Sequence, residues 1–270
     1  MKKIIIEQKV IDSVILDYVN GFSIHRLNKK YGINTRKISQ LLKDNNIKIR
    51  SRRKFFYDES FFETIDNGLK AYWLGFIFAD GCVRDIKSGY TLKIKLSQKD
   101  ESHLVNFNKH IGNNNGVIRT ETSKFKGANG KEYESTGKVL LINSKKIVKD
   151  LVKLGCHQNK TSNIKFPILR NELISSFILG YFDGDGCITQ KKVKNGIYYT
   201  VTFTSGSEFF LNRIKDELIN FGIKSISKYN YSTFYRLQIS NKIDLLRLKN
   251  YFYSDNEYYL YRKKTKFDKI

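Results

Sequence analysis

The chain has 270 residues, of which 40% are hydrophobic and 14% aromatic, enough for two or three units with real cores. A formal charge of +23, from 49 Lys and Arg against 26 Asp and Glu, indicates a polyanionic partner, nucleic acid ahead of an anionic membrane surface. Apolar runs stay well below the roughly 20 residues that cross a bilayer, and Glu7 interrupts the apolar start. We expect a soluble intracellular protein with no membrane partner.

Residues 1–49 predict a small module of three short helices. Apolar residues at helical spacing run over 11–18, and an Asn-Gly pair ends this stripe. Ser23 is placed to cap a second helix that continues through Tyr31, and Gly32 supplies a sharp turn before a third helix. This pattern of helix, glycine turn and helix is typical of a helix-turn-helix.

The module resembles the helix-turn-helix of resolvase and invertase DNA-binding regions. In a helix-turn-helix the second of the two helices lies in the major groove. Residues 1–54 hold 14 Lys and Arg against four acids, which fits a DNA-binding role. A three-helix packing module with a solvated basic face is the alternative. The positions expected to face DNA are Thr35, Arg36, Lys37, Ser39, Gln40 and Lys43.

A basic run follows this module in the predicted linker, residues 50–60. Its arginines are Arg50, Arg52 and Arg53. The run is either a plain solvated linker or a strap along the phosphate backbone, and the basic charge on both sides favours the strap.

From about residue 55 the sequence repeats itself once, which predicts two similar halves at 61–165 and 166–270. Three stretches recur in the same order: 73–83 at 178–188, 96–104 at 203–211, and 140–144 at 237–241. Each half is predicted to run helix, strand, strand, helix, strand, strand, helix. Leu92 and Ile94 alternate with Lys93 and Lys95, so each sheet is expected to pack an apolar face on helices and to offer a polar face to a ligand.

Each half begins with an apolar helix that carries small residues four positions apart. These are Gly75 and Ala79 in the first helix, and Gly180 and Gly184 in the second. Small residues at this spacing let two helix backbones approach closely, so the two helices are expected to pack against each other.

Both apolar helices end in an Asp-Gly pair, Asp80-Gly81 and Asp185-Gly186, in which the glycine is expected to act as a C-terminal cap. A carboxylate at a helix C-terminus meets partial negative charge, and two such ends together compound the repulsion. A divalent cation between them would relieve it, and carboxylate oxygens favour Mg²⁺ or Ca²⁺. With DNA phosphates present, this predicts metal-assisted phosphodiester hydrolysis. A plain turn after a buried helix is the alternative, and the duplication disfavours it.

The two Asp-Gly helices resemble the paired signature helices of LAGLIDADG homing endonucleases, and the repeat covers about four fifths of the chain. The resemblance implies an α+β fold: a pseudo-twofold pair of αββαββα halves that forms a saddle over DNA, here preceded by an all-α helix-turn-helix module. It also implies a monomer that uses Mg²⁺, or another divalent cation such as Mn²⁺, to make a staggered double-strand break at a long target in double-stranded DNA.

Carried over position by position, the resemblance implies metal binding by Asp80 and Asp185. Phe78 stands where the family has an earlier acid, which the second copy keeps as Asp183. Residues implied to order solvent or to stand near the scissile phosphate are Gln98, with Ser205 as its repeat partner, Lys160 and Lys263. The saddle surface would be lined by Lys93, Lys95, Arg119, Thr202, Lys228, Arg236 and Gln238.

The same fold family includes intron maturases, which act on intron RNA, and transcription regulators that have lost catalysis. Both are alternatives for this chain. The presence of both Asp80 and Asp185 favours cleavage and leaves a dual role open. An intein is disfavoured, because Met1 is not a splicing nucleophile and the sequence ends in Phe-Asp-Lys-Ile.

Overall fold

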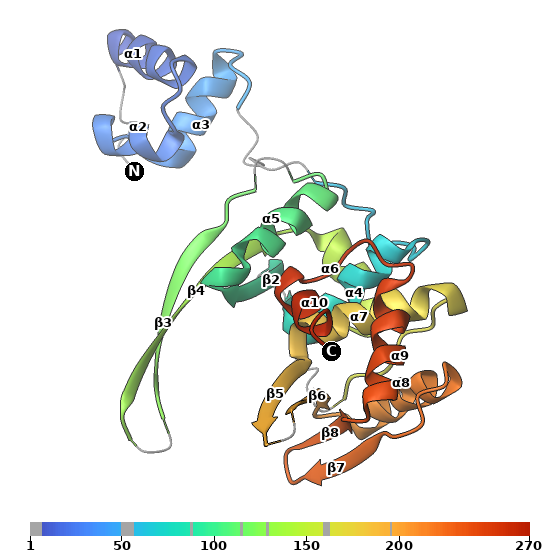
Figure 1. The fold of residues 1–270 in the computed structure, drawn as a ribbon. Helices are drawn as coiled ribbons and strands as arrows, with labels where there is room; N and C mark the ends of the chain where they lie inside the picture. Colours follow the sequence, from blue (N-terminus) through green and yellow to red (C-terminus); the bar gives the residue numbers. More distant parts are fainter. Residues whose placement is uncertain are drawn as a thin grey trace. The chain divides into compact units, whose positions relative to one another are not determined.

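The computed structural model describes residues 7–49, 57–86, 89–113, 116–127, 130–158, 163–194 and 196–270. The chain divides into two compact units, Met1–Lys54 and Phe55–Ile270 (Figure 1). Within the described ranges, no helix is both long and apolar enough to cross a membrane.

The first unit consists of three short helices around a small core. They are α1 (Gln8–Val19), α2 (Ile24–Tyr31) and α3 (Thr35–Asp44). The hydroxyl of Ser23 accepts a hydrogen bond from the amide of Arg26 and caps α2, while Gly32 ends that helix in a left-handed conformation with φ of 66°. Val14, Leu27 and Ile38, one from each helix, are completely buried in the core.

The second unit repeats one order of elements. The first half contains α4 (Gly68–Asp80), β1 (Gly81–Ile86), β2 (Gly89–Ser97), the 3₁₀ turn η1 (Gln98–Asp100), α5 (Glu101–His110), β3 (Arg119–Lys126), β4 (Glu132–Ile142) and α6 (Lys145–Lys153). The second half contains α7 (Asn171–Asp185), β5 (Cys187–Val193), β6 (Gly196–Ser205), α8 (Glu208–Asn220), β7 (Ser227–Tyr231), β8 (Phe234–Ile239) and α9 (Lys242–Tyr253), followed by α10 (Tyr261–Phe267). The predicted α+β fold of two αββαββα halves is confirmed.

Each half contains one antiparallel four-stranded sheet, with strand order β1-β2-β4-β3 in the first and β5-β6-β8-β7 in the second. The alternation in the central strands has the predicted effect, because Leu92, Ile94, Val201 and Phe203 are almost fully buried. In Figure 1 the hairpin of β3 and β4 extends far beyond the rest of its sheet, whereas the hairpin of β7 and β8 is short.

The strand registers show that the predicted alignment of the halves is wrong by two residues within the central strands. Val83 pairs with Leu92, and Ile188 pairs with Val201, so Ile94 corresponds to Phe203 in place of Leu96. The helices that follow do begin at aligned positions, Glu101 and Glu208, so η1 takes up the two extra residues. A slip of two keeps every side chain on its own face of the sheet, so hydrophobic alternation cannot detect it.

Candidate active site and nucleic-acid interface

The helices α4 and α7 cross in direct contact at the centre of the second unit. A Cβ atom added to Gly75 would overlap the carbonyl oxygen of Phe177 and lie 2.9 Å from the amide nitrogen of Tyr181. Gly180 faces α4 in the same way, because its Cβ would overlap the carbonyl oxygen of Tyr72. Backbone therefore touches backbone at this crossing, which explains why small residues are required there.

This crossing places the ends of the two helices side by side. Asp80 is the last residue of α4 and Asp185 is the last residue of α7. A Cβ on Gly184, the residue before Asp185, would lie 3.3 Å from Oδ2 of Asp80. Asp80 is half-buried and Asp185 is exposed. The two predicted carboxylates thus end at one place, although they come from helices about 100 residues apart in the sequence.

The glycines after these carboxylates cap the two helices as predicted, because their amides donate to the carbonyl oxygens of Ile77 and Phe182, but neither glycine is left-handed. Gly81 has φ −79° and ψ 133°, and Gly186 has φ −78° and ψ 159°, which is extended backbone open to any residue. Their role is steric. A Cβ on Gly81 would lie 2.6 Å from the carbonyl oxygen of Ile77, and a Cβ on Gly186 would lie 2.6 Å from that of Phe182. Glycine lets the chain turn directly from the helix into a strand.

A small pocket of about 70 Å³ opens beside Asp185, and Tyr181 and Ser205 also line it. The phenol of Tyr181 is buried and donates a hydrogen bond of 2.7 Å to the carbonyl oxygen of Thr204. Burial raises the pKa of Tyr181, and the negative charge of Asp185 and, to a smaller degree, that of Asp80 raise it further. The negative charges of both carboxylates therefore raise the pKa of the same buried phenol.

Asp80 and Asp185 form a pair of hard oxygen donors. In the described part of the chain, no group of three or more His, Cys, Asp or Glu side chains could hold a metal ion. Two carboxylates fit a weakly held Mg²⁺, an ion that usually takes only one or two carboxylates from the protein. They do not fit a closed structural metal site.

Lys263 is buried against the end of α7, the helix that ends in Asp185. It is only 3% exposed, and its ammonium donates to the carbonyl oxygens of Phe182 at 2.6 Å, Asp183 at 2.7 Å and Gly186 at 2.6 Å. The C-terminal segment folds back so that this cation satisfies the last carbonyls of α7. Burial lowers the pKa of Lys263 to about 8. Part of the negative charge at the end of α7 is thus offset by a side chain and needs no metal ion.

Asp183 belongs to a buried polar network that the sequence does not predict. Its Oδ2 accepts hydrogen bonds from the hydroxyl of Tyr72 at 2.8 Å and from the amide of Leu260 at 2.6 Å. The hydroxyl of Tyr72 also lies 3.0 Å from Nε2 of His103, so this nitrogen donates when the hydroxyl proton is used toward an ionised Asp183. Burial raises the pKa of Asp183 to about 7 and lowers that of His103 to about 3.

The polar faces of the two sheets carry six of the seven predicted saddle residues. These are Lys93, Lys95, Arg119, Thr202, Arg236 and Gln238. The ammonium of Lys93 lies 2.8 Å from Glu121, and that of Lys95 donates to Ser123 at 2.6 Å. In the second sheet Thr202 pairs with Gln238, and the guanidinium of Arg236 lies 5.1 Å from the ring centre of Tyr231.

Lys228 is the exception, and its placement on the saddle is wrong. It pairs across the sheet with Leu237, which is completely buried, so it points to the side that the helices cover. Its ammonium lies 2.6 Å from Oε1 of Glu208 and 2.8 Å from Oδ1 of Asn212, both on α8. The strand was too short for its own alternation to fix the face.

The remaining predicted catalytic residues lie in different settings. Gln98 is exposed at the start of η1, immediately after β2. Ser205 is buried at the end of β6, where its hydroxyl accepts a hydrogen bond from the amide of Ser207. The predicted residues that fall outside the described ranges are Lys160, Arg50, Arg52 and Arg53.

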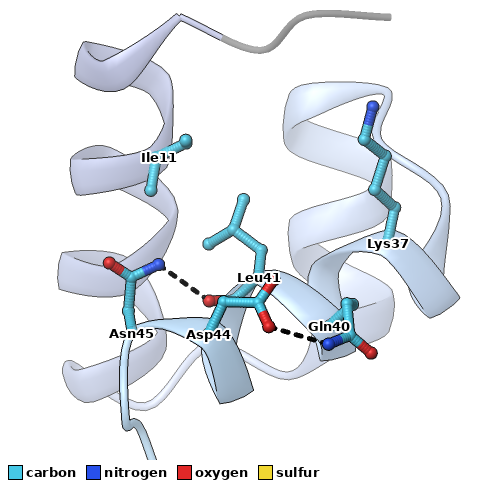
Figure 2. Close-up of a pocket in the computed structure, with 6 residues that line it drawn as sticks. All are labelled: Ile11, Lys37, Gln40, Leu41, Asp44 and Asn45. Atoms are coloured by element: carbon cyan, nitrogen blue, oxygen red, sulfur yellow. Dashed lines mark hydrogen bonds between the residues drawn. The ribbon is translucent and has the colours of Figure 1, made fainter. Parts of the chain in front are cut away.

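In the first unit, α3 exposes most of its predicted DNA-facing residues. Arg36, Lys37, Gln40 and Lys43 are exposed, whereas Thr35 and Ser39 are half-buried. Figure 2 shows Lys37 and Gln40 beside a shallow pocket of about 320 Å³ that Ile11 of α1 also lines. The amide of Gln40 donates to Asp44 at 2.7 Å, which holds it along the helix.

The comparisons with known proteins agree with this architecture. Residues 172–252 match the model of the LAGLIDADG-like domain. Two proteins of Methanocaldococcus jannaschii are similar: a probable translation initiation factor IF-2, 32% identical over 187 residues, and a replication factor C small subunit, 27% identical over 207 residues. The matches cover 66% and 73% of this chain but 14% and 10% of those proteins, so the chain spans about a seventh and a tenth of their length. Because their names describe unrelated functions, neither name says what the matched segment does.

Among solved structures, that of the homing endonuclease I-WcaI bound to its DNA recognition sequence is similar, with a TM-score of 0.52 at 14% identity. The match covers 88% of this chain and 96% of that one. At this identity the likeness concerns the fold. Residues 172–252 in the second half thus match the LAGLIDADG-like domain, and the first half repeats the same order of elements and packs its helix α4 on α7.

Proposed function

We propose that this chain is a site-specific DNA endonuclease that cuts both strands of a long duplex target, as homing endonucleases do. The observation that carries the proposal is the meeting of Asp80 and Asp185 at the ends of two crossing helices. Each of the two helices leads into a sheet with a polar face, and the chain as a whole carries a charge of +23. The fold that it shares with a DNA-bound homing endonuclease supports the same function.

In this proposal Asp80 and Asp185 are the residues that would hold Mg²⁺ or Mn²⁺. When bound, such an ion activates water and stabilises the leaving oxygen. Gln98, exposed beyond the end of β2, orders solvent near the phosphate. Tyr181, buried with a raised pKa, stays protonated and lines the small pocket beside Asp185. The lysines and arginines on the polar faces neutralise backbone phosphates.

The proposed domain roles follow the repeat. The halves 61–165 and 166–270 each cut one strand, which gives a staggered break by a monomer with internal pseudo-twofold symmetry. The module at 1–49 extends the contact with DNA through α3.

The test of the chemistry uses the carboxylate variants Asp80→Asn and Asp185→Asn. Each is expected to lower Mg²⁺-dependent cleavage of the DNA target by roughly a thousandfold or more, since one ligand of a two-carboxylate site is lost. DNA binding without added cation should be unchanged or tighter, because a negative charge near phosphate is removed. Asp216→Asn, an exposed acid on α8, is the matched control. Unaltered nicking by either carboxylate variant, or binding by the native chain without any cutting, would contradict the proposal.

The test of the N-terminal module removes charge from α3. Changing Arg36, Lys37 and Lys43 to glutamine is expected to weaken DNA binding and to reduce the salt slope of log K by up to about 3, while the cleavage rate of bound DNA stays the same. The control changes the exposed Lys9 and Lys29, on α1 and α2, to glutamine and should alter the salt slope of log K much less. Binding titrations at several salt concentrations measure both. Equal slopes for the two variants would rule out groove contact by α3.

A further inference from the structure

The last segment of each half reaches across to the other half, and the two contacts are made at equivalent places. In the chain after α6, the carbonyl oxygen of Ile164 accepts a hydrogen bond of 2.9 Å from the hydroxyl of Ser207. In the chain after α9, the Nε of Arg262 donates to the carboxylate of Asp100 at 2.7 Å and 3.0 Å. Asp100 and Ser207 each stand immediately before the second helix of their half, α5 and α8. The two halves therefore hold each other at matching points.

Ser207 belongs to a turn that reaches the pocket beside Asp185. Its hydroxyl accepts a hydrogen bond of 3.3 Å from the amide of Phe210, which caps α8, and its own amide donates to the hydroxyl of Ser205 at 3.1 Å. Ser205 lines that pocket. In the second half, the contact from the first half thus fixes a turn at the edge of the candidate active site.

Asp100 uses its side chain differently from Ser207. It precedes α5 but makes no capping hydrogen bond to that helix, and its side chain is only 7% exposed. A buried carboxylate is costly unless a partner compensates it, and Arg262 supplies both a charge and a hydrogen bond. Asp100 is also the last residue of η1, the turn that begins with Gln98. Arg262 therefore holds the turn that carries the residue proposed to order solvent.

Arg262 is itself fixed against α7 by its neighbours in the chain. Two residues earlier, the amide of Leu260 donates to Oδ2 of Asp183 at 2.6 Å. One residue later, the ammonium of Lys263 donates to four carbonyl oxygens at or just after the end of α7. The end of α7 is thus connected through Arg262 to η1 in the other half.

We propose that Arg262 is a positioning residue for DNA cleavage, which sets the place of η1 and Gln98 relative to the end of α7. It acts through Asp100 and needs no contact with the reacting atoms. Because the equivalent contact in the second half joins Ser207 to Ile164, loss of Arg262 disturbs only the turn of the first half. One strand is then cut more slowly than the other. This inference rests on the proposed function, because it assumes that each half cuts one strand.

The test replaces Arg262 by glutamine and follows each DNA strand separately. The substrate is a duplex that the native chain selects from a random pool and cuts, and single-turnover reactions with saturating protein and Mg²⁺ give one rate for each strand. In Arg262→Gln we expect one strand to be cut roughly tenfold to a hundredfold more slowly and the other to change by less than about threefold, so that nicked DNA accumulates. The affinity for DNA without divalent cation should be unchanged, which places the effect in the bound complex.

Arg247→Gln is the matched control for a loss of stability. Arg247 on α9 lies 3.0 Å from the similarly buried carboxylate of Asp244, and the two arginine side chains are 42% and 39% exposed. The pair of Arg247 and Asp244 stays within one helix of the second half. Both strands should therefore be cut by Arg247→Gln as they are by the native chain.

Two further variants keep the test open if Arg262→Gln does not fold. Asp100→Asn removes the ion pair without leaving a buried charge, so it should fold and should slow the same strand. Arg262→Lys keeps a cation near Asp100 and should be slowed less than Arg262→Gln, because part of the contact is restored.

Equal slowing of both strands, or the same bias between strands in Arg247→Gln, would overturn the inference. Weaker binding with a lower salt slope in Arg262→Gln would also overturn it, since that result would place Arg262 on a phosphate. A native chain that cuts neither strand would instead contradict the proposed function. Hydrogen exchange at residues 98–100 then decides the role of Arg262: faster exchange in Arg262→Gln than in Arg247→Gln supports it, and equal exchange overturns it.

Discussion

Gly180→Ala will destabilise the second unit by roughly 2 kcal/mol or more, although alanine is the better helix former by about 1 kcal/mol. The new methyl group would overlap the carbonyl oxygen of Tyr72 and lie 2.9 Å from the amide nitrogen of Phe76. Both are backbone atoms in the middle of α4, so no rotamer change can relieve the contact. The helices must separate along their whole crossing, which also disturbs the packing around Phe78 and Phe177.

The measurement is unfolding followed through the fluorescence of Trp73, the single tryptophan of the chain, which lies on α4. For a unit of this size the expected fall in midpoint temperature is roughly 4–8 °C. Gly75→Ala should behave alike, because it faces the backbone of Phe177. Gly68→Ala on the same helix is the control, since its Cβ would meet only the rotatable hydroxyl of Ser176 at 3.0 Å. Native stability in Gly180→Ala would show that the helices are not in backbone contact.

The buried network of His103, Tyr72 and Asp183 is expected to make stability depend on pH in two opposing ways. Burial raises the pKa of Asp183 from 3.8 to about 7, so between these values the folded state holds a proton that the unfolded state lacks. Its contribution to stability therefore falls as pH rises from about 4 to 7. Burial lowers the pKa of His103 from 6.5 to about 3, so between these pH values the unfolded state holds a proton that the folded state lacks. Its contribution falls as pH decreases from 6.5 to 3.

Single substitutions should separate the two effects. In His103→Gln the term from Asp183 remains, and stability relative to the native chain should rise as pH decreases from 7 to 4. In Asp183→Asn the contribution of His103 remains, and stability relative to the native chain should fall as pH decreases from 7 to 4. Each relative slope is expected to approach about 1.4 kcal/mol per pH unit. Urea unfolding at several pH values, again followed by Trp73, measures both slopes.

The control for this pair is His25→Gln, because His25 is exposed on α2 in the other unit. It should leave the pH profile of the Trp73 transition unchanged. Parallel profiles for native chain, His103→Gln and Asp183→Asn would mean that neither group is buried in the way described.

The sequence by itself determined the features that depend on local order and spacing. The repeat of helix, strand, strand, helix, strand, strand, helix follows from two copies of the same hydrophobic periods. The position of Asp80 and Asp185 at helix ends follows from where the apolar runs stop. The packing of α4 on α7 was predictable, because small residues four apart have few other uses in an apolar helix.

Long-range placement was decided only by the tertiary structure. Lys263 caps α7 because the C-terminal segment folds back over a helix about 80 residues earlier, and nothing near Lys263 in the sequence encodes that return. Asp183 meets Tyr72 and Leu260 for the same reason. The repeat suggested similar environments for matched positions, but burial and charge at each position depend on neighbours that the repeat does not specify.

The periods of strands and helices also limit what a sequence can determine. The alternation of apolar and polar residues in a strand is unchanged by a shift of two residues, so it could not align Ile94 with Phe203. It also could not assign a face to Lys228, whose strand has only five residues. The sequence Asp-Gly at a helix end does not tell whether glycine is needed for a left-handed conformation or because a Cβ atom would clash with the backbone of the helix. The sequence thus identified which two carboxylates matter. The small residues also predicted that the two helices pack together, and the structure decided how closely. At Gly75 and Gly180 backbone touches backbone, and that distance depends on parts of the chain that are remote in sequence.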